Sequence, residues 1–363
     1  MRKFGLLFGN GLFALPALAL LGGLALMSSK ANAITYGAQD CEDNATNLNC
    51  GHPNVVSLSG FRPATPDDNT TADLVSFVRC TGSLLRKDED KFVILTAGHC
   101  ASAWLAGLQD GSILDVGVSF DALINRDVSP ELGRWSPAQF ILGGQPVLSP
   151  DYGFQGNNKS IPHYDYAVVV FEIPPGGLVT DGGESVDIST LDVVNIPPVD
   201  YLVGKVGGRK RPTLTEVGYG VGEHHNAPGT GGNAGGSTED LSKLGVRWVA
   251  DHTQAFHFKG PERNLLGGAQ NPARGFNGTC SGDSGGPVFY EEINGLESTE
   301  IQVGITSSGD AQCVSMANSA RTDAARAHAF IACTLEGETA DDIGDCGCLA
   351  VDSKELCAKN NSK

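Results

Sequence analysis

The chain has 363 residues, of which 40% are hydrophobic, so it is long enough to bury one large core or two small ones. Its formal net charge of −17 argues against nucleic acid or an anionic membrane as a partner, because phosphate groups would be repelled. Solubility alone is sufficient to explain such a charge.

The first 33 residues have the organisation of a secretory signal peptide. A basic start at residues 2–3 precedes an uncharged apolar stretch over residues 4–27, and Ala-Asn-Ala at residues 31–33 is a small-x-small cleavage signal. A membrane anchor is the alternative, because residues 12–27 are nearly long enough to cross a bilayer. We expect cleavage after Ala33 and a secreted or periplasmic chain that touches a membrane only through the uncleaved signal. Cleavage removes three basic residues and no acidic ones, so the net charge changes from −17 to −20.

The 10 cysteines are even in number and all follow the signal segment. In an oxidising compartment they are expected to form disulfides rather than zinc sites or free thiols. Cys346-Gly347-Cys348 lacks the spacing of a zinc knuckle, and we expect no metal and no cofactor. Spacing leaves several pairings open, namely those of Cys41, Cys50, Cys333, Cys346, Cys348 and Cys357.

Beyond the signal, short β-favouring runs alternate with clusters of Gly, Pro, Asn and Asp. The runs are residues 55–58, 75–80, 92–97, 166–171, 288–290 and 301–306. This alternation predicts an all-β barrel or sandwich. The Pro- and Gly-rich residues 173–200 are interpreted as a crossover between two halves.

Residues 226–240 are very rich in Gly, and we expect a mobile surface loop there. A phosphate-binding loop is the alternative, but the segment has no Gly-x-x-x-x-Gly-Lys pattern.

One helix is expected near the end of the chain, over residues 322–335. Thr322 is the expected cap. The apolar face of this helix would hold Ala327, Phe330, Ile331 and Leu335. Residues 336–363 follow as a tail that contains cysteines.

Three segments carry residues suited to peptide hydrolysis by a covalent route. This chemistry needs a nucleophile, a base, a group that orients the base, and donors for the oxyanion. In chain order the segments are residues 95–100 (Leu-Thr-Ala-Gly-His-Cys), 165–170 (Asp-Tyr-Ala-Val-Val-Val) and 280–287 (Cys-Ser-Gly-Asp-Ser-Gly-Gly-Pro). Taken singly, the first two are weak signals, since an Asp before a strand is also ordinary turn chemistry. The third is the most specific pattern in the chain.

With these motifs in the order His, Asp, Ser, the sequence resembles the chymotrypsin/trypsin-like serine peptidases. The resemblance covers residues 34–335 in outline, and only the three motif segments match closely. It implies an all-β fold of two six-stranded antiparallel β-barrels, over residues 34–178 and 200–320, with a C-terminal helix.

The resemblance also assigns roles within the site. His99 would be the general base and then the general acid, Asp165 would orient it, and Ser284 would be the nucleophile. The backbone N–H groups of Gly282 and Ser284 would form the oxyanion hole. His163 is interpreted as a surface residue.

Two disulfides follow from the same resemblance. Cys80 would pair with Cys100 and close the loop that presents His99. Cys280 would pair with Cys313 beside the expected substrate pocket.

In this family Asp283 pairs with a new α-ammonium group, and that pairing forms the oxyanion hole and pocket. Signal cleavage would place Ile34 at the N-terminus, followed by Thr35-Tyr36-Gly37. The match to the Ile-Val-Gly-Gly pattern is partial, because Thr35 and Tyr36 depart from it. We expect signal cleavage itself to create the active terminus.

The primary pocket is expected at Gly278, Ser307, Gly309 and Ser319. Gly278 occupies the position where an Asp would select Lys or Arg, so we expect an uncharged pocket that accepts a medium or large apolar side chain. Asp310 lies near the expected rim, where its charge could alter this preference. Ser308 replaces the aromatic residue usual in the family.

These observations predict a monomeric, secreted serine endopeptidase that acts on protein or peptide substrates. A catalytically silent binding protein with the same fold is the alternative, although such relatives usually lack a triad residue. Broad digestion and narrow processing both remain open.

Overall fold

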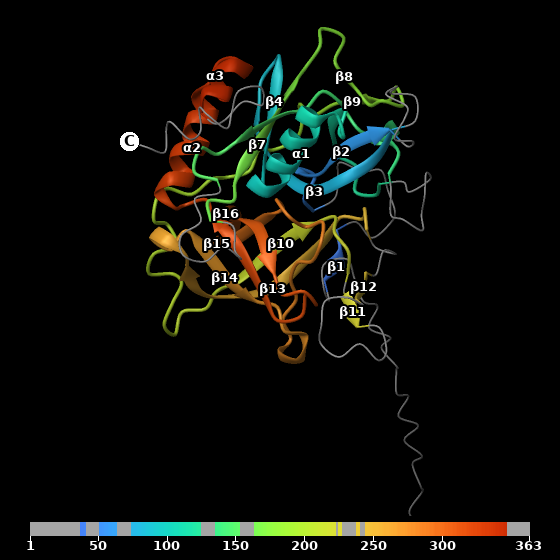
Figure 1. Cartoon of the computed structure of the whole chain (residues 1–363). Helices are drawn as coiled ribbons and strands as arrows, with labels where there is room; N and C mark the ends of the chain where they lie inside the picture. The colour runs from blue at the N-terminus through green and yellow to red at the C-terminus, as the bar shows by residue number, and fades with distance from the viewer. Residues whose placement is uncertain are drawn as a thin grey trace, which may run out of the picture. The chain divides into compact units, whose positions relative to one another are not determined.

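The computed structural model describes residues 37–40, 51–63, 74–124, 135–152, 163–222, 224–226, 237–239 and 244–346. All of them lie within one compact unit, Ala31–Lys363 (Figure 1). The expected signal segment, Ile34, Cys41, Cys50, Cys348, Cys357 and most of the Gly-rich residues 226–240 lie outside the described residues.

Two antiparallel sheets make up most of the fold. The first has six strands in the order β5-β2-β3-β4-β7-β6. The Val118–Ile141 bridge and a hydrogen bond from Gly144 N to Val116 O join its two edges. The strands are β2 (Val55–Pro63), β3 (Leu74–Lys87), β4 (Lys91–Thr96), β5 (Asp115–Ser119), β6 (Gln145–Leu148) and β7 (Ala167–Glu172).

The second sheet has the order β1-β13-β10-β15-β16-β17-β14, and pairing of β13 with β14 closes six of its strands into a barrel. Six strands were expected here, and the seventh, β1, pairs with the outside of β13 because Ala38 and Gln39 align with Val249 and Trp248. The strands are β1 (Ala38–Gln39), β10 (Thr213–Gly218), β13 (Trp248–Lys259), β14 (Leu265–Ala269), β15 (Pro287–Asn294), β16 (Glu297–Gly309) and β17 (Met316–Arg321). The double-barrel fold class is confirmed.

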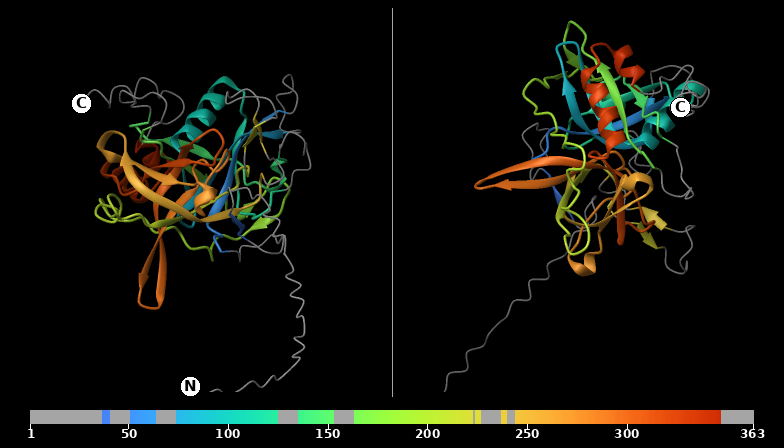
Figure 2. Two further views of the ribbon diagram at one scale, coloured as in Figure 1. Left: turned by 90° about the horizontal axis from the view of Figure 1, so that it is seen from below. Right: turned by 90° about the vertical axis from the view of Figure 1, so that its left-hand side faces the viewer.

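Each of the six expected β-favouring runs coincides with a strand, although Ala97 and Tyr166 lie one residue outside β4 and β7. Residues 173–200 lie in the connection between β7 and β10. Two small ladders add β8 (Leu178–Val179) with β9 (Ser185–Val186), and β11 (His224–Asn226) with β12 (Ser237–Glu239). The described residues also form short 3-10 helices, η3 (Pro137–Gln139), η5 (Pro261–Arg263) and η6 (Pro272–Arg274). The hairpin of β15 and β16 extends away from the rest of the unit (Figure 2).

Helix α1 (Gly98–Asp110) was not expected from the sequence. It begins at the residue before His99 and contacts β3, β6 and β7. Its buried side chains are those of Cys100, Ala101, Trp104 and Leu105, so one apolar face recurs every fourth residue. Gly111 ends the helix in a left-handed conformation at φ 77°, which glycine adopts at little cost.

The C-terminal helix α2 (Ala325–Glu336) begins three residues later than expected. Thr322 does not cap it, because its hydroxyl group donates to Gln302 O in the core and Ala324 holds the cap position. Ala327, Phe330 and Ile331 are buried as expected, whereas Leu335 is 39% exposed. A disulfide from Cys333 to Cys346 connects α2 to the end of α3 (Ala340–Asp345).

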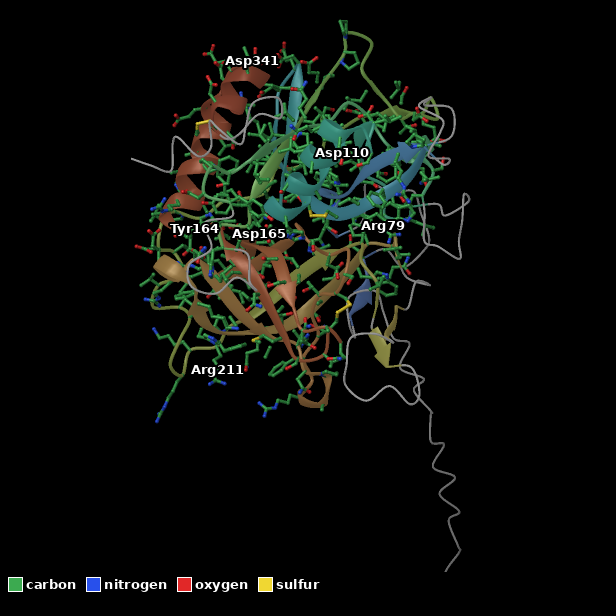
Figure 3. The ribbon with its side chains drawn as sticks, in the orientation of Figure 1. Arg79, Asp110, Tyr164, Asp165, Arg211 and Asp341 are labelled. Carbon is green, nitrogen blue, oxygen red and sulfur yellow. A yellow bond between two sulfur atoms is a disulfide. The ribbon has the colours of Figure 1, made fainter. Side chains whose placement is uncertain are left out.

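The two sheets contact each other through β2 with β10 and β3 with β15. Asp165 lies in this central region in Figure 3. Residues from both sheets therefore meet at one place.

Candidate active site

A buried aspartate holds a histidine at the beginning of α1. Asp165 is fully buried, and its two carboxylate oxygens accept from the backbone N of His99 at 2.7 Å and from His99 Nδ1 at 2.8 Å. Burial alone would lower the pKa of His99, but the hydrogen bond and charge of Asp165 raise it above its ordinary value. The ring is thus fixed through Nδ1, and 33% of the side chain remains exposed to meet a substrate.

Ser307 is a second side-chain donor to this aspartate. Its hydroxyl group donates to Asp165 Oδ2 at 2.6 Å, the same oxygen that binds His99 Nδ1. Ser307 was expected only as part of the substrate pocket. The hydrogen bond shows that it also supports Asp165, because a buried carboxylate needs donors to offset its desolvation.

Ser284 lies at the junction of the two sheets. Its carbonyl oxygen accepts from Thr81 N of β3 at 2.8 Å, and the next residue, Gly285, donates from its backbone N to Thr306 O of β16 at 2.8 Å. The Cys80–Cys100 disulfide lies against it, with Cys100 Sγ 3.9 Å from Ser284 O. Ser284 is therefore held beside the start of α1, where His99 lies.

The turn around Ser284 leaves two backbone donors available. The N–H groups of Asp283, Gly285 and Gly286 donate to the carbonyl groups of Cys280, Thr306 and Asp283. Gly282 has φ 96°, a conformation that favours glycine. Among the described residues, no backbone acceptor is found for the N–H groups of Gly282 and Ser284.

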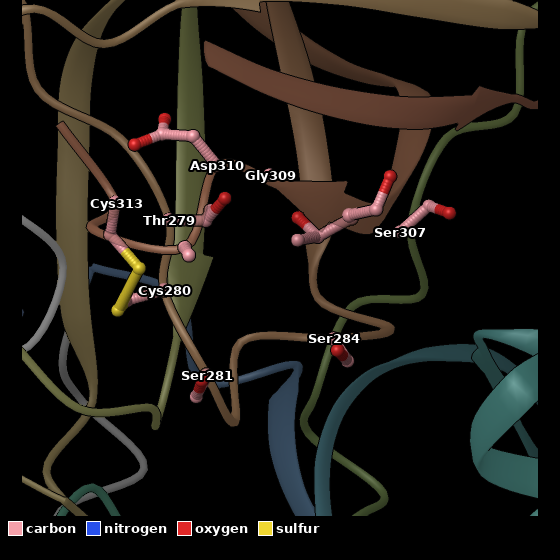
Figure 4. Close-up of a pocket in the computed structure, with 11 residues that line it drawn as sticks. Thr279, Cys280, Ser281, Ser284, Ser307, Gly309, Asp310 and Cys313 are labelled. Carbon is pink, nitrogen blue, oxygen red and sulfur yellow. A yellow bond between two sulfur atoms is a disulfide. The ribbon is translucent and has the colours of Figure 1, made fainter. Parts of the chain in front are cut away.

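A cavity of about 360 Å³ opens beside Ser284 (Figure 4). It is lined by Thr279, Cys280, Ser281, Ser284, Thr306, Ser307, Ser308, Gly309, Asp310, Ala311 and Cys313. Ser307 and Gly309 are thus on its wall as expected, and the Cys280–Cys313 disulfide closes one side.

The other two expected pocket residues do not line this cavity. The fully buried side chain of Gln270 covers Gly278, and a Cβ on that glycine would lie 2.2 Å from Gln270 Oε1. Gln270 Oε1 also accepts from Thr279 N at 2.9 Å. Ser319 is buried in β17 and pairs with Thr306 and Leu266. No sequence signal marks Gln270. Its contact with Gly278 arises only when the loop between β14 and Ser284 folds back on itself.

Asp310 lines the cavity, but its carboxylate is already bound by backbone groups. Oδ1 accepts from Met316 N at 2.7 Å and Ser315 N at 2.8 Å, and Oδ2 accepts from Val314 N at 3.2 Å. Burial raises its pKa, but these backbone hydrogen bonds outweigh burial and keep the pKa below the ordinary value. The donors occupy both carboxylate oxygens, so Asp310 stabilises its own loop while it keeps its negative charge.

Asp283 points away from the cavity into the protein. Its oxygens accept from Gly220 N at 2.7 Å and Cys280 N at 2.8 Å. Burial, and to a lesser degree the nearby Glu216, raise its pKa to about 8, although the two backbone donors lower it. No ion pair to Asp283 is found among the described residues, and Ile34 lies outside them.

His163 is buried, at 4% exposure, so the expectation of a surface residue was wrong. A Cβ on Gly260 would lie 2.7 Å from its Nδ1, because the β13–β14 turn packs against it. Burial lowers the pKa of His163.

One group of potential metal ligands occurs among the described residues, and it comprises Cys80, His99 and Cys100. The two sulfurs are bonded to each other, so neither can supply the thiolate that a metal needs. Among the residues that the structure describes, no helix is long and apolar enough to cross a membrane.

Two antiparallel barrels define the chymotrypsin-like class of fold, with a hydrogen-bonded His–Asp pair in the first and a serine in a glycine-rich turn of the second. No protein-family model matches the chain. It is 26% identical over 294 residues to a trypsin-like protease of Streptomyces glaucescens, covering 80% of this chain and 85% of that protein. It is 28% identical over 283 residues to a phenoloxidase-activating enzyme of Bombyx mori, covering 73% of this chain and 57% of that protein.

These relatives and the fold agree with one another. The resemblance to the chymotrypsin/trypsin-like serine peptidases is confirmed.

Proposed function

We propose that the chain is a secreted serine endopeptidase that cleaves peptide bonds through an acyl-enzyme intermediate. The observation that carries the proposal is the hydrogen-bonded His99–Asp165 pair at the start of α1, next to the turn that carries Ser284, in a chain similar to a trypsin-like protease. A silent binding protein would have no need of a buried carboxylate that accepts from both His99 and Ser307.

In the proposed mechanism, His99 takes the proton from Ser284 Oγ as that oxygen attacks the substrate carbonyl carbon. The oxyanion accepts from the N–H groups of Gly282 and Ser284. His99, now protonated and stabilised by Asp165, gives its proton to the leaving amine. Water then hydrolyses the acyl-enzyme with His99 again acting as the base.

The primary pocket is proposed to accept an uncharged side chain. Gly278 provides no carboxylate, Gln270 covers it with an amide, and the carboxylate of Asp310 is bound by three backbone donors. Peptide-library profiling tests this, and a strong preference for Lys or Arg before the cleaved bond would contradict it.

Activation is proposed to follow signal cleavage after Ala33, when the α-ammonium group of Ile34 pairs with Asp283. A buried carboxylate without a cation is costly, and this terminus would supply the missing charge. Sequencing the N-terminus of the secreted protein tests the idea, since a terminus downstream of Ile34 would overturn it.

Hydrolysis of a denatured protein substrate tests the proposed activity. The purified mature chain should release peptides, and Ser284→Ala and His99→Ala should abolish release. Ser298→Ala removes a serine hydroxyl on the exposed β15–β16 hairpin, away from the cavity, and is the matched control, which should keep activity. A folded native protein with no activity would favour the binding alternative.

A further inference from the structure

Two buried carboxyl groups face the same side of β10. Glu216 is 1% exposed, and Asp283 is fully buried. Gly218 lies two residues after Glu216 and therefore on the same face of the strand. A Cβ on Gly218 would lie 2.1 Å from Asp283 Oδ1, so this strand face is in direct contact with Asp283.

The charges around this pair are not balanced by any described cation. Glu216 has no ion pair among the described residues, and its side chain contacts Thr253 of β13. Its backbone partner on β15 is the apolar Val288. Asp251 and His252, the charged neighbours on β13, are exposed and bind each other. Within the part of the chain that the structure describes, Asp283 is the titratable group that remains facing Glu216.

The hydrogen bonds to Thr253 indicate which form of Glu216 the site holds. Thr253 Oγ1 lies 2.9 Å from Glu216 Oε2 and 2.8 Å from the carbonyl oxygen of Asn277. A hydroxyl group has one proton, and a carbonyl oxygen can only accept. If Thr253 donates to Asn277, its oxygen is free to accept a proton from a neutral Glu216, and all three groups are satisfied.

Charge balance points to the same form. A terminal ammonium group bound at Asp283 compensates one negative charge, so a second buried carboxylate would remain uncompensated. Burial raises the pKa of Glu216 to about 7, although the Thr253 bond lowers it. The pair is therefore best satisfied when it keeps one proton.

Asn277 connects this pair to the substrate pocket. Its Oδ1 accepts from His252 N at 2.7 Å and its Nδ2 donates to Asp251 Oδ1 at 3.0 Å. Thr279, two residues further on, lines the cavity beside Ser284. Hydrogen bonds to both the side chain and the carbonyl group of Asn277 thus hold the start of the pocket wall in place.

We propose that Glu216 is a positioning residue for the substrate pocket, a buried neutral carboxyl group that holds Asn277 through Thr253 while Asp283 carries the negative charge. The proposal rests on the proposed peptidase function. Glu216 touches neither the substrate nor the reacting atoms. We therefore expect it to affect substrate affinity through the position of the pocket wall.

The test compares KM and kcat in variants of the mature enzyme. Thr253→Val should raise KM about tenfold, the factor that corresponds to one lost hydrogen bond, with a smaller change in kcat. Thr253→Ser keeps the hydroxyl group and should restore the native KM. An unchanged KM in Thr253→Val would overturn the proposal.

Glu216→Gln tests the proton itself, because a side-chain amide donates to Thr253 at any pH. The native KM should rise between pH 6.5 and pH 8.5 as Glu216 loses its proton, and this rise should be absent from the Gln variant. An equal rise in both would contradict the proposal.

Thermal unfolding gives a readout that does not depend on activity. In a Ser284→Ala background, Glu216→Gln should raise the melting temperature at pH 8.5 more than at pH 5. At pH 8.5 the buried carboxyl group of Glu216 is charged and destabilises the folded state, whereas the amide of Gln stays neutral. No labelling of native Ser284 by a fluorophosphonate would contradict the peptidase function, whereas a labelled enzyme with unaffected variants would contradict only the role of Glu216.

Discussion

The hydroxyl group of Thr81 joins the first sheet to the turn that carries Ser284. It donates to Gly282 O at 3.0 Å and accepts from Tyr219 N at 3.2 Å, and the residue is fully buried. Thr81→Val keeps the shape but removes both bonds, leaving one buried carbonyl group and one buried N–H group unpaired. At 1–3 kcal/mol for each unpaired group, the free energy of unfolding should fall by about 3 kcal/mol.

Urea unfolding in a Ser284→Ala background measures this change without autolysis. Thr81→Ser is the matched control, because it keeps the hydroxyl group and should cost only about 1 kcal/mol for the lost methyl group. In the active enzyme, Thr81→Val should also lower kcat, since Gly282 loses its anchor. A Val variant no less stable than the Ser variant would refute the role given to the hydroxyl group.

Two further variants test the supports of the site. Ser307→Ala removes one donor from Asp165, so the carboxylate should hold the His99 proton more tightly and raise the pKa of His99 further. Because the base must be neutral, the acidic limb of the kcat/KM profile should move to higher pH, and an unmoved limb would contradict this. Gly278→Asp should fail to create cleavage after Lys or Arg, because its Cβ would collide with Gln270 Oε1 at 2.2 Å. Measured hydrolysis of Arg substrates by this variant would show that Gln270 moves aside.

The sequence predicted those parts of the fold that depend on local pattern. Apolar runs rich in β-branched residues, such as residues 166–171, form buried strands because β-branched side chains favour the extended conformation. The helix α1 was missed because its apolar face is short and contains small residues such as Cys100 and Ala101, so the sequence shows little helical periodicity. Thr322 was assigned to a cap, yet the core offered its hydroxyl group a better acceptor at Gln302.

The candidate site likewise has a part that the sequence predicted and a part that it did not. Its motif residues were recognisable because the chemistry fixes their types and the family resemblance supplies their order. Ser307 bonds to Asp165 from β16, and Gln270 covers Gly278 from the residue after β14, but a single serine or glutamine carries no sequence pattern. The same holds for the proposed role of Glu216, which depends on its contact with Thr253. His163 was placed at the surface because its polarity gave no sign of the β13–β14 turn that covers it.

An activated serine is the central claim, and a fluorophosphonate probe measures it most directly. The purified mature protein should be labelled on Ser284 alone, as located by mass spectrometry, and the label should disappear in Ser284→Ala and in His99→Ala. Ser298→Ala, on the exposed β15–β16 hairpin, should still be labelled. A folded native protein that takes no label, or takes it equally without His99, would contradict the account.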